Sequence, residues 1–174
     1  VLVDDGKIAY LINLYNFYTL KLIVDHYPVK SIRDIKAPWD QKFVPFLGKK
    51  VSLNHLEHDI LRKEFKQPRV HFALVCASKS CPALPPFPFQ SAHLDSQLDK
   101  AAVEFLSDRN KNRFEKEKFY CSQIFEWYGD DFNEAYGGYV RFVEKILGSP
   151  HGIKKHRFLE YDWSLNETEP CPAP

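Results

Sequence analysis

The chain has 174 residues, of which 44% are hydrophobic and 27% are charged, and its formal net charge is +1. This composition supports one globular domain with an ordinary core, and the chain is too short for two large domains. So small a net charge argues against a dedicated binder of nucleic acid or of a membrane surface. The longest charge-free apolar run, residues 8–20, is shorter than the roughly 20 residues that cross a bilayer, so we expect no membrane span in this segment.

The sequence contains four cysteines and no methionine. Because translation starts with methionine, we expect the chain to be an N-terminally incomplete excerpt or a processed product. The cysteines are too few and too unevenly spaced for a small disulfide scaffold, so their redox state stays open. We expect a single domain over residues 1–166 and a flexible, proline-bearing tail over 167–174.

A long apolar stretch predicts a first helix over residues 7–26, because Asp4 and Asp5 favour a helix start and Pro28 ends it. Apolar side chains cover every face of this helix, so we expect it to be buried. Asn13 and Asn16 lie three residues apart on one of its faces. A buried amide without partners costs about 1–3 kcal/mol, so both side chains must hydrogen-bond to something specific.

Shorter elements follow the first helix. We expect a capped helical turn over 31–35 and a hairpin formed by 43–46 and 50–53 around Gly48. Asn54 then lies three residues before Glu57, which is capping-box spacing and predicts a helix to about residue 65.

Residues 69–77 are ambiguous from sequence. Pro68 suits the first turn of a helix, whereas alternating apolar residues suit one face of a strand, and we favour a buried strand. Four prolines then make 78–90 an extended loop. The later predictions are a helix opened by Ser91, a second hairpin over 112–121 turning at Lys116 and Glu117, helices over 122–127 and 139–147, and a last strand over 157–161. These elements predict an α+β fold, a largely helical single domain with a buried N-terminal helix, two short hairpins and a small antiparallel sheet.

Reactive side chains are densest where segment 69–77 meets the proline-rich loop. A thiol there becomes a useful nucleophile when a nearby cation or histidine lowers its pKa. Cys81 is the first candidate and Cys76 the alternative. His71 and Cys76 differ by five positions and therefore point in different directions on any regular element, whereas the loop can fold Cys81 back onto His71 or His58. The neighbouring side chains expected to bind substrate are Ser78, Lys79 and Ser80.

Other polar residues complete the candidate site. His58 is a second candidate base, because an imidazole with a near-neutral pKa suits proton transfer, and Glu57 is expected beside it at the helix cap. Asp162 and Trp163 suit a pocket wall in which the carboxylate orients a histidine. The cluster of His58, His71, Cys76 and Cys81 contains metal-ligand types, but its spacing matches no specific metal motif, so we expect neither a metal nor a cofactor.

Six segments in order along the chain carry a family pattern: IAYLINLYNFYTL, HYPVKSIRDI, SLNHLEHDILR, PRVHFALVCASKSCP, SQIFEWYGDDF and FLEYDWSLN. From about Lys7 to Asn166 the sequence thereby resembles the DUF547 family of uncharacterised domains. It departs from the family pattern at Leu11, where an aromatic residue is usual, at His55, where Asp is more common, and at Cys121, where an aliphatic residue is more common. These departures make His55 and Cys121 weak functional candidates.

The resemblance implies a compact α+β domain that occurs widely in bacteria, often in exported or membrane-associated proteins, and in eukaryotes joined to leucine-zipper, DEP or glutaredoxin-like segments. For a bacterial source it favours an exported or periplasmic location over a cytoplasmic one. A distant similarity to papain-like or transglutaminase-like thiol enzymes is also part of this expectation. The motif residues that it carries over are Asn13, Asn16, Glu57, His58, His71, Cys76, Ser78, Ser80 and Cys81.

We therefore expect a thiol-dependent, peptidase-like hydrolase or acyl transferase in which Cys81 attacks a carbonyl and His71 or His58 accepts its proton. Asn13 or Asn16 would hold the imidazole or donate to the oxyanion. The competing hypothesis is a non-catalytic interaction module, in which the same Asn, His and Ser groups form a structural network and a groove binds a peptide. A third alternative joins Cys76 and Cys81 in a disulfide. A peptide or protein is the expected substrate or partner, and nucleic acid is not.

Overall fold

The computed structural model of the chain describes residues 4–148 and 152–167. Its longest element is helix α1, Asp4–His26, which confirms the predicted first helix. Asp4 and Asp5 lie in the first turn, where carboxylates interact favourably with the helix dipole. At the other end, His26 Nδ1 lies 2.9 Å from the carbonyl oxygen of Leu22, and Pro28 prevents continuation of the helix.

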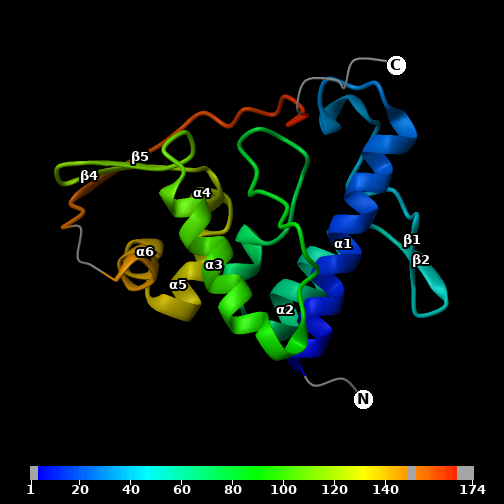
Figure 1. Cartoon of the computed structure of the whole chain (residues 1–174), viewed down its shortest axis with the longest axis horizontal. Helices are drawn as coiled ribbons and strands as arrows, with labels where there is room; N and C mark the ends of the chain where they lie inside the picture. The colour runs from blue at the N-terminus through cyan, green and yellow to red at the C-terminus, as the bar shows by residue number, and fades with distance from the viewer. Residues whose placement is uncertain (1–3, 149–151, 168–174) are drawn as a thin grey trace.

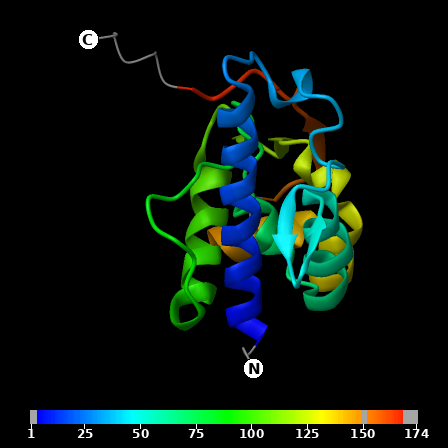
Figure 2. The ribbon, with the colours of Figure 1, turned by 90° about the vertical axis from the view of Figure 1, so that its right-hand side faces the viewer.

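The prediction that α1 is buried on all sides is wrong. One face packs into the core, but Tyr10, Phe17, Leu20 and Val24 are exposed. Figure 2 shows why: α1 runs along one side of the fold, so that part of its surface packs on the rest of the chain and part faces outward. The apolar residues of α1 therefore divide into a buried face and an exposed face.

The other helical elements are short. In chain order they are η1 (Ile32–Asp34), η2 (His55–Leu61), α2 (Arg62–Phe65), η3 (Pro68–Phe72), η4 (Ser91–His93), α3 (Leu94–Ser107), α4 (Ile124–Trp127), α5 (Gly129–Tyr136) and α6 (Tyr139–Leu147). Ser31 caps η1 as predicted, since its side chain accepts a hydrogen bond from the backbone of Arg33. Element η2 is wound as a π-helix, with the N–H of Arg62 donating to the carbonyl of Glu57.

Two small sheets complete the fold (Figure 1). Strands β1 (Val44–Phe46) and β2 (Lys49–Val51) form the predicted first hairpin, an antiparallel pair around Gly48. Strands β3 (Arg113–Glu115) and β4 (Lys118–Cys121) form the predicted second hairpin. Strand β5 (Lys155–Phe158) pairs in parallel with β4, so this sheet is mixed. The α+β class is confirmed.

Several local predictions need correction. Residues 69–77 do not form a strand, because Pro68 opens the 3-10 helix η3, which ends at Phe72. The predicted Asn54–Glu57 capping box does not form: the hydroxyl of Ser52 accepts from the His55 backbone instead, at 3.1 Å. Ser91 opens η4 and not α3, which begins at Leu94. Helix α5 was not predicted, and the last strand lies slightly earlier than predicted. Of the predicted tail, residues 168–174 lie outside the described residues.

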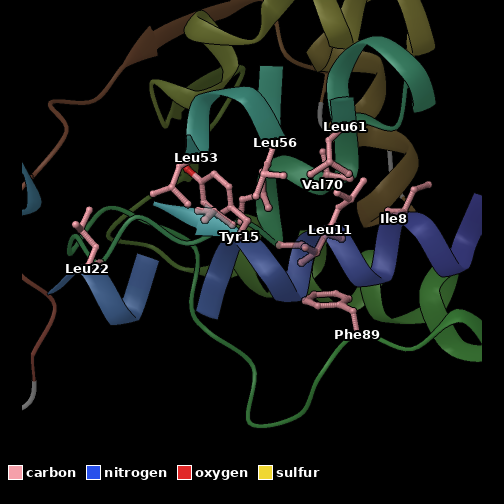
Figure 3. Packing of buried hydrophobic residues seen from close by; sticks show 14 of the residues in the cluster. Ile8, Leu11, Tyr15, Leu22, Leu53, Leu56, Leu61, Val70 and Phe89 are labelled. Atoms are coloured by element: carbon pink, nitrogen blue, oxygen red, sulfur yellow. The ribbon is translucent and has the colours of Figure 1, made fainter. Parts of the chain in front are cut away.

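Two hydrophobic clusters make up the core. In the first, α1 packs through Ile8, Leu11 and Tyr15 against Leu56 and Val70 (Figure 3). The second cluster is rich in aromatic rings, and its largest fully buried members are Phe72, Phe119, Phe125, Phe132 and Phe142. Segment 68–77 contributes Val70 to the first cluster and Phe72 to the second. The residues between and just after these two therefore lie where the clusters meet.

None of the helices in the described part of the chain combines the length and the hydropathy that crossing a bilayer requires.

Candidate functional site

A cleft of about 260 Å³ lies where segments of both clusters approach each other. The titratable side chains that line it are Tyr15, Glu57, His58, His71, Cys76, Cys81, Tyr128 and Tyr161. They come from α1, η2, η3, the segment after η3, the C-terminal end of α4 and the segment after β5. Concave sites that gather groups from distant parts of a chain are the usual location of ligand binding and catalysis.

Cys76 is the partly exposed thiol of the cleft. Its sulfur lies 3.2 Å from the hydroxyl of Ser78 and 3.3 Å from the hydroxyl of Tyr161. A hydrogen bond from the thiol of Cys81, together with those from Ser78 and Tyr161, outweighs burial and lowers the pKa of Cys76 to about 7. Donors beside a sulfur stabilise a thiolate, which is the reactive form of cysteine.

Cys81, the first nucleophile candidate from sequence, is in a different environment. Its side chain is buried, and its sulfur accepts a hydrogen bond of 2.7 Å from the backbone N–H of Cys76. Burial, followed by the interaction with Cys76, raises the pKa of the Cys81 thiol well above its ordinary value. The geometry thus favours Cys76 over Cys81 as a nucleophile. Both residues, with Cys121, are free thiols, so the predicted alternative of a Cys76–Cys81 disulfide is not what the structure contains.

His71 is buried against the cleft and is held by a carboxylate. Its Nε2–H donates to Asp131 at 2.7 Å, and its ring stacks on Tyr128 with 3.7 Å between ring centroids. Because Nε2 carries the proton that is hydrogen-bonded to Asp131, the neutral ring keeps a lone pair on Nδ1. That nitrogen is buried and has no hydrogen-bond partner among residues 4–148 and 152–167. Burial lowers the pKa of His71 despite the opposing effects of Asp131 and Glu57.

Arg62 fixes the position of Asp131. Its Nε and Nη2 donate to the two carboxylate oxygens at 2.7 and 2.8 Å, a bidentate pairing. Although burial alone would raise it, these bonds and the one from His71 hold the pKa of Asp131 well below its ordinary value. Asp131 therefore stays ionised and can orient the imidazole of His71.

Glu57 and Tyr128 form a second pair in the cleft. The Tyr128 hydroxyl donates to Glu57 Oε1 at 2.6 Å, and that oxygen lies 4.0 Å from His71 Nδ1. Burial and the Glu57 carboxylate raise the pKa of Tyr128, so it remains a neutral donor. The predicted capping role of Glu57 is replaced by this contact.

His58, the alternative base, is engaged differently from His71. Its Nδ1 accepts a hydrogen bond of 3.0 Å from Nη1 of Arg62. No carboxylate contacts its ring among the described residues. His58 borders the cleft, but its Nδ1 lone pair is already used.

Aromatic rings form much of the cleft wall. Trp39, Trp127 and Trp163, which are all three tryptophans of the chain, line it. Trp163 lies 5.7 Å from Trp127 and 5.8 Å from Trp39, between ring centroids. Trp163 therefore lies in the wall of this cleft. Such a wall offers apolar area to a ligand and reduces the water near the reactive groups.

Asn13 and Asn16 do not reach His71. The Asn16 amide donates to the carbonyl of Ala73 at 2.8 Å and accepts from the N–H of Val75 at 2.9 Å. The Asn13 amide contacts Phe89 in the same two-sided way, at 2.8 and 2.9 Å. Each amide thus supplies the hydrogen bonds that a neighbouring strand or helical turn would otherwise give to these backbone groups. Asn16 holds the chain immediately before Cys76, so it acts on the cleft indirectly.

The loop after Cys76 pairs with the segment after β5. Lys79 and Ser80 donate their backbone N–H groups to the carbonyls of Ser164 and Asp162, at 2.9 and 3.2 Å, and the hydroxyl of Ser80 accepts from the backbone of Asp162 at 2.9 Å. The carboxylate of Asp162 is exposed and accepts from the backbone of Ser164. Asp131, and not Asp162, is the carboxylate that contacts His71. Of the three loop residues 78–80, it is Ser78 whose side chain contacts the sulfur of Cys76.

The sequence-based expectation that His71 and Cys76 point apart assumed one regular element across both residues. The helix η3 ends at Phe72, so the two residues do not share one regular element, and both line the cleft. The sequence-based prediction missed Tyr15, Tyr128 and Asp131 as site residues. The only sequence signal for Asp131 was its acidic pair with Asp130 inside a family motif.

In the described part of the chain, no group of three or more His, Cys, Asp and Glu side chains is arranged to hold a metal ion.

The comparison with known families identifies the N-terminal part of the chain. The family model described as "Protein of unknown function, DUF547" matches residues 2–106. The chain has no match among curated proteins and none among solved structures.

Proposed function

This chain belongs to the DUF547 family, whose function is unknown, and we propose from the geometry of its cleft that it is a thiol-dependent hydrolase or acyl transferase with Cys76 as the nucleophile. The observation that carries the proposal is that Cys76 and His71 line the same cleft. A thiol with a pKa of about 7 and a buried imidazole with an unpartnered nitrogen line the same cleft in the described part of the chain. Nucleophile, base and orienting carboxylate are the components of covalent acyl transfer.

In the first step, the Cys76 thiolate attacks the carbonyl carbon of the substrate, and the carbonyl electron pair moves onto oxygen. Before this attack, His71 Nδ1 has accepted the proton of the Cys76 thiol, and it gives that proton to the leaving group as the tetrahedral intermediate collapses. Asp131 keeps the Nε2 proton in place, so that the tautomer with a free Nδ1 persists. The product of this step is a thioester on Cys76.

In the second step, water or an acceptor nucleophile attacks the thioester. His71 Nδ1 takes the proton of the attacking group, and the sulfur leaves as a thiolate that the Ser78 and Tyr161 hydroxyls stabilise. Hydrolysis and acyl transfer differ only in which nucleophile arrives. The aromatic wall excludes some water, which suits an acceptor other than water.

Tyr15 is the donor that we assign to the developing oxyanion. It projects from α1 towards the side of the core that carries Leu53 and Leu56 (Figure 3), and it lines the cleft. Its hydroxyl makes no hydrogen bond within the described residues, and burial raises its pKa, so it remains a neutral donor. Removal of one such donor typically costs about 10²–10³ in rate.

The proposal is tested with p-nitrophenyl acetate, a small activated ester that needs no knowledge of the natural substrate. We expect a burst of nitrophenolate and an acetyl group on Cys76, identified by mass spectrometry. Cys76→Ala removes the burst, and His71→Ala slows it by about 10²–10⁴. Cys121→Ala and His93→Ala are matched controls, buried-thiol and exposed-imidazole changes away from the cleft, and should leave the burst intact.

Two results would contradict the proposal. An unmodified Cys76 in folded protein would favour the non-catalytic interaction module. Acetylation that proceeds equally well in His71→Ala, but is lost in His58→Ala, would assign the base to His58 and overturn the roles of His71 and Asp131.

A further inference from the structure

The backbone brings two cysteines together where no regular element connects them. Between Cys76 and Cys81 the chain reverses: Ala77 has a φ of 57°, and the N–H of Cys81 donates to the carbonyl of Ser78 at 3.0 Å. The left-handed conformation is unfavourable for a residue with a Cβ, so this turn is held by its surroundings. The hydrogen bonds of Lys79 and Ser80 to the segment after β5 supply that support.

The result is direct contact between the two cysteines. The N–H of Cys76 donates to the sulfur of Cys81 at 2.7 Å, and the Cys81 thiol is also a hydrogen-bond partner of the Cys76 sulfur. Disulfides require Cα atoms within about 7 Å and side chains that approach one another. A sulfur that already touches the backbone and the side chain of the other cysteine satisfies both conditions without rearrangement of a helix or strand.

The two thiols differ in access, which gives them different roles. Cys76 is partly exposed in the cleft, whereas Cys81 is 2% exposed. A small oxidant in the cleft therefore meets Cys76 more readily than the nearly buried Cys81. Redox-sensitive cysteines typically combine an accessible thiolate with a nearby resolving thiol.

We propose that Cys76 and Cys81 form a peroxide-oxidisable pair, in which Cys76 is oxidised first and Cys81 resolves the product to an intramolecular disulfide. In the first step the Cys76 thiolate attacks one oxygen of a hydroperoxide. The O–O bond breaks, Cys76 becomes a sulfenic acid, and the other oxygen leaves as an alcohol or water after protonation.

In the second step the sulfur of Cys81 attacks the sulfenic sulfur of Cys76. The S–S bond forms, the sulfenic hydroxyl leaves, and it takes the Cys81 proton to become water. Overall, two thiols lose two electrons and two protons, and one peroxide is reduced. The disulfide protects Cys76 from irreversible oxidation to the sulfinic acid, and a thiol reductant restores it.

This oxidation does not depend on the proposed acyl transfer. The disulfide would nevertheless block acyl transfer, because Cys76 would no longer be a free nucleophile. The test uses the full chain with Cys171→Ser, which leaves only the three cysteines that the structure describes. The protein is reduced, exposed to hydrogen peroxide, alkylated with iodoacetamide and mapped by mass spectrometry. We expect a Cys76–Cys81 disulfide that dithiothreitol reverses, and an unmodified Cys121, whose pKa burial raises to about 12.

The matched variant is Cys81→Ser, which keeps a small polar side chain but cannot form the disulfide. In it we expect Cys76 to proceed to the sulfinic acid, so that the thiol recovered after dithiothreitol falls about tenfold relative to the parent. Circular dichroism of the variant, and of Cys81→Ala as a second one, establishes that the fold is retained.

Three outcomes would overturn the proposal: no oxidation of Cys76, a disulfide that involves Cys121, or equal loss of recoverable Cys76 thiol with and without Cys81. Each is independent of the ester experiment on reduced protein. Formation of the disulfide without acetylation of Cys76 would support this inference and contradict the proposed function. Acetylation of Cys76 without formation of the disulfide would support the proposed function and contradict this inference.

Discussion

The side-chain oxygen of Asn16 accepts a hydrogen bond of 2.9 Å from the backbone N–H of Val75, one residue before Cys76. The same amide donates to the carbonyl of Ala73, so a polar side chain of α1 hydrogen-bonds to backbone groups that lie outside any helix or strand. This explains a buried amide in an otherwise apolar helix face. The amide positions Cys76 without touching it.

Asn16→Ala should therefore affect both stability and the thiol. It leaves a buried N–H and a buried carbonyl without partners, which we expect to lower the free energy of unfolding by about 2–4 kcal/mol. Denaturant unfolding measures that loss, and iodoacetamide labelling should show that the pKa of Cys76 rises. Asn13→Ala is the control, because it frees Phe89 and not the segment before Cys76. Equal effects of both variants on labelling would contradict the positioning role.

Alkylation of Cys76 should have a midpoint near pH 7, since that is about where its thiolate forms. A lowered thiol pKa means that the reactive anion is present above this pH and lost below it. Tyr161→Phe and Ser78→Ala each remove a hydroxyl beside the sulfur and should raise the midpoint by roughly one pH unit. Rates of iodoacetamide labelling against pH give the midpoints. A midpoint close to that of a free thiol in the unchanged protein would show that these donors do not act on Cys76.

Asp131→Asn should destabilise the fold at neutral pH by about 2 kcal/mol, because it removes charge-assisted hydrogen bonds to Arg62 and His71. The folded pKa of Asp131 lies below its unfolded value, so its stabilisation is present above the unfolded pKa and is lost as the pH falls through the folded one. The gap between parent and variant should shrink below about pH 4. Unfolding curves across this range provide the check, and a constant gap would contradict the assignment.

Tryptophan emission should report only on the cleft, because all three tryptophans line it. We expect acetylation or alkylation of Cys76 to change the emission intensity or wavelength. Cys76→Ala treated in the same way is the control and should show no change. An equal change in that variant would mean that the emission responds to labelling elsewhere.

Much of the local structure was predictable from sequence, because it rests on local signals. Proline and acidic residues bound α1, and Gly48 and the polar pair at Lys116 and Glu117 predict the two hairpin turns. The predictions failed where contacts over long distances in sequence decide the outcome. Segment 69–77 has the alternation of a strand, but it pairs with no strand in the described part of the chain and is held instead by Asn16.

The candidate site was predicted less completely, for the same reason. Residue types alone located Cys76, Cys81 and His71, but choosing between the thiols required their burial, which depends on the whole fold. The carboxylate on His71 is 60 positions away from it in sequence, at Asp131. Spacing cannot reveal such a partner, and Asp162 beside an aromatic pair was the more conspicuous candidate.

The cleft is assembled from both halves of the chain. Cys76, His71 and Glu57 precede residue 106, whereas Tyr128, Asp131 and Tyr161 follow it. A shortened protein ending at that boundary would keep Cys76 and His71 but lose the carboxylate of Asp131, which contacts the imidazole, and the hydroxyl of Tyr161, which lies beside the sulfur. Sequences that share only the first half therefore lack part of the set of side chains on which the proposed chemistry depends.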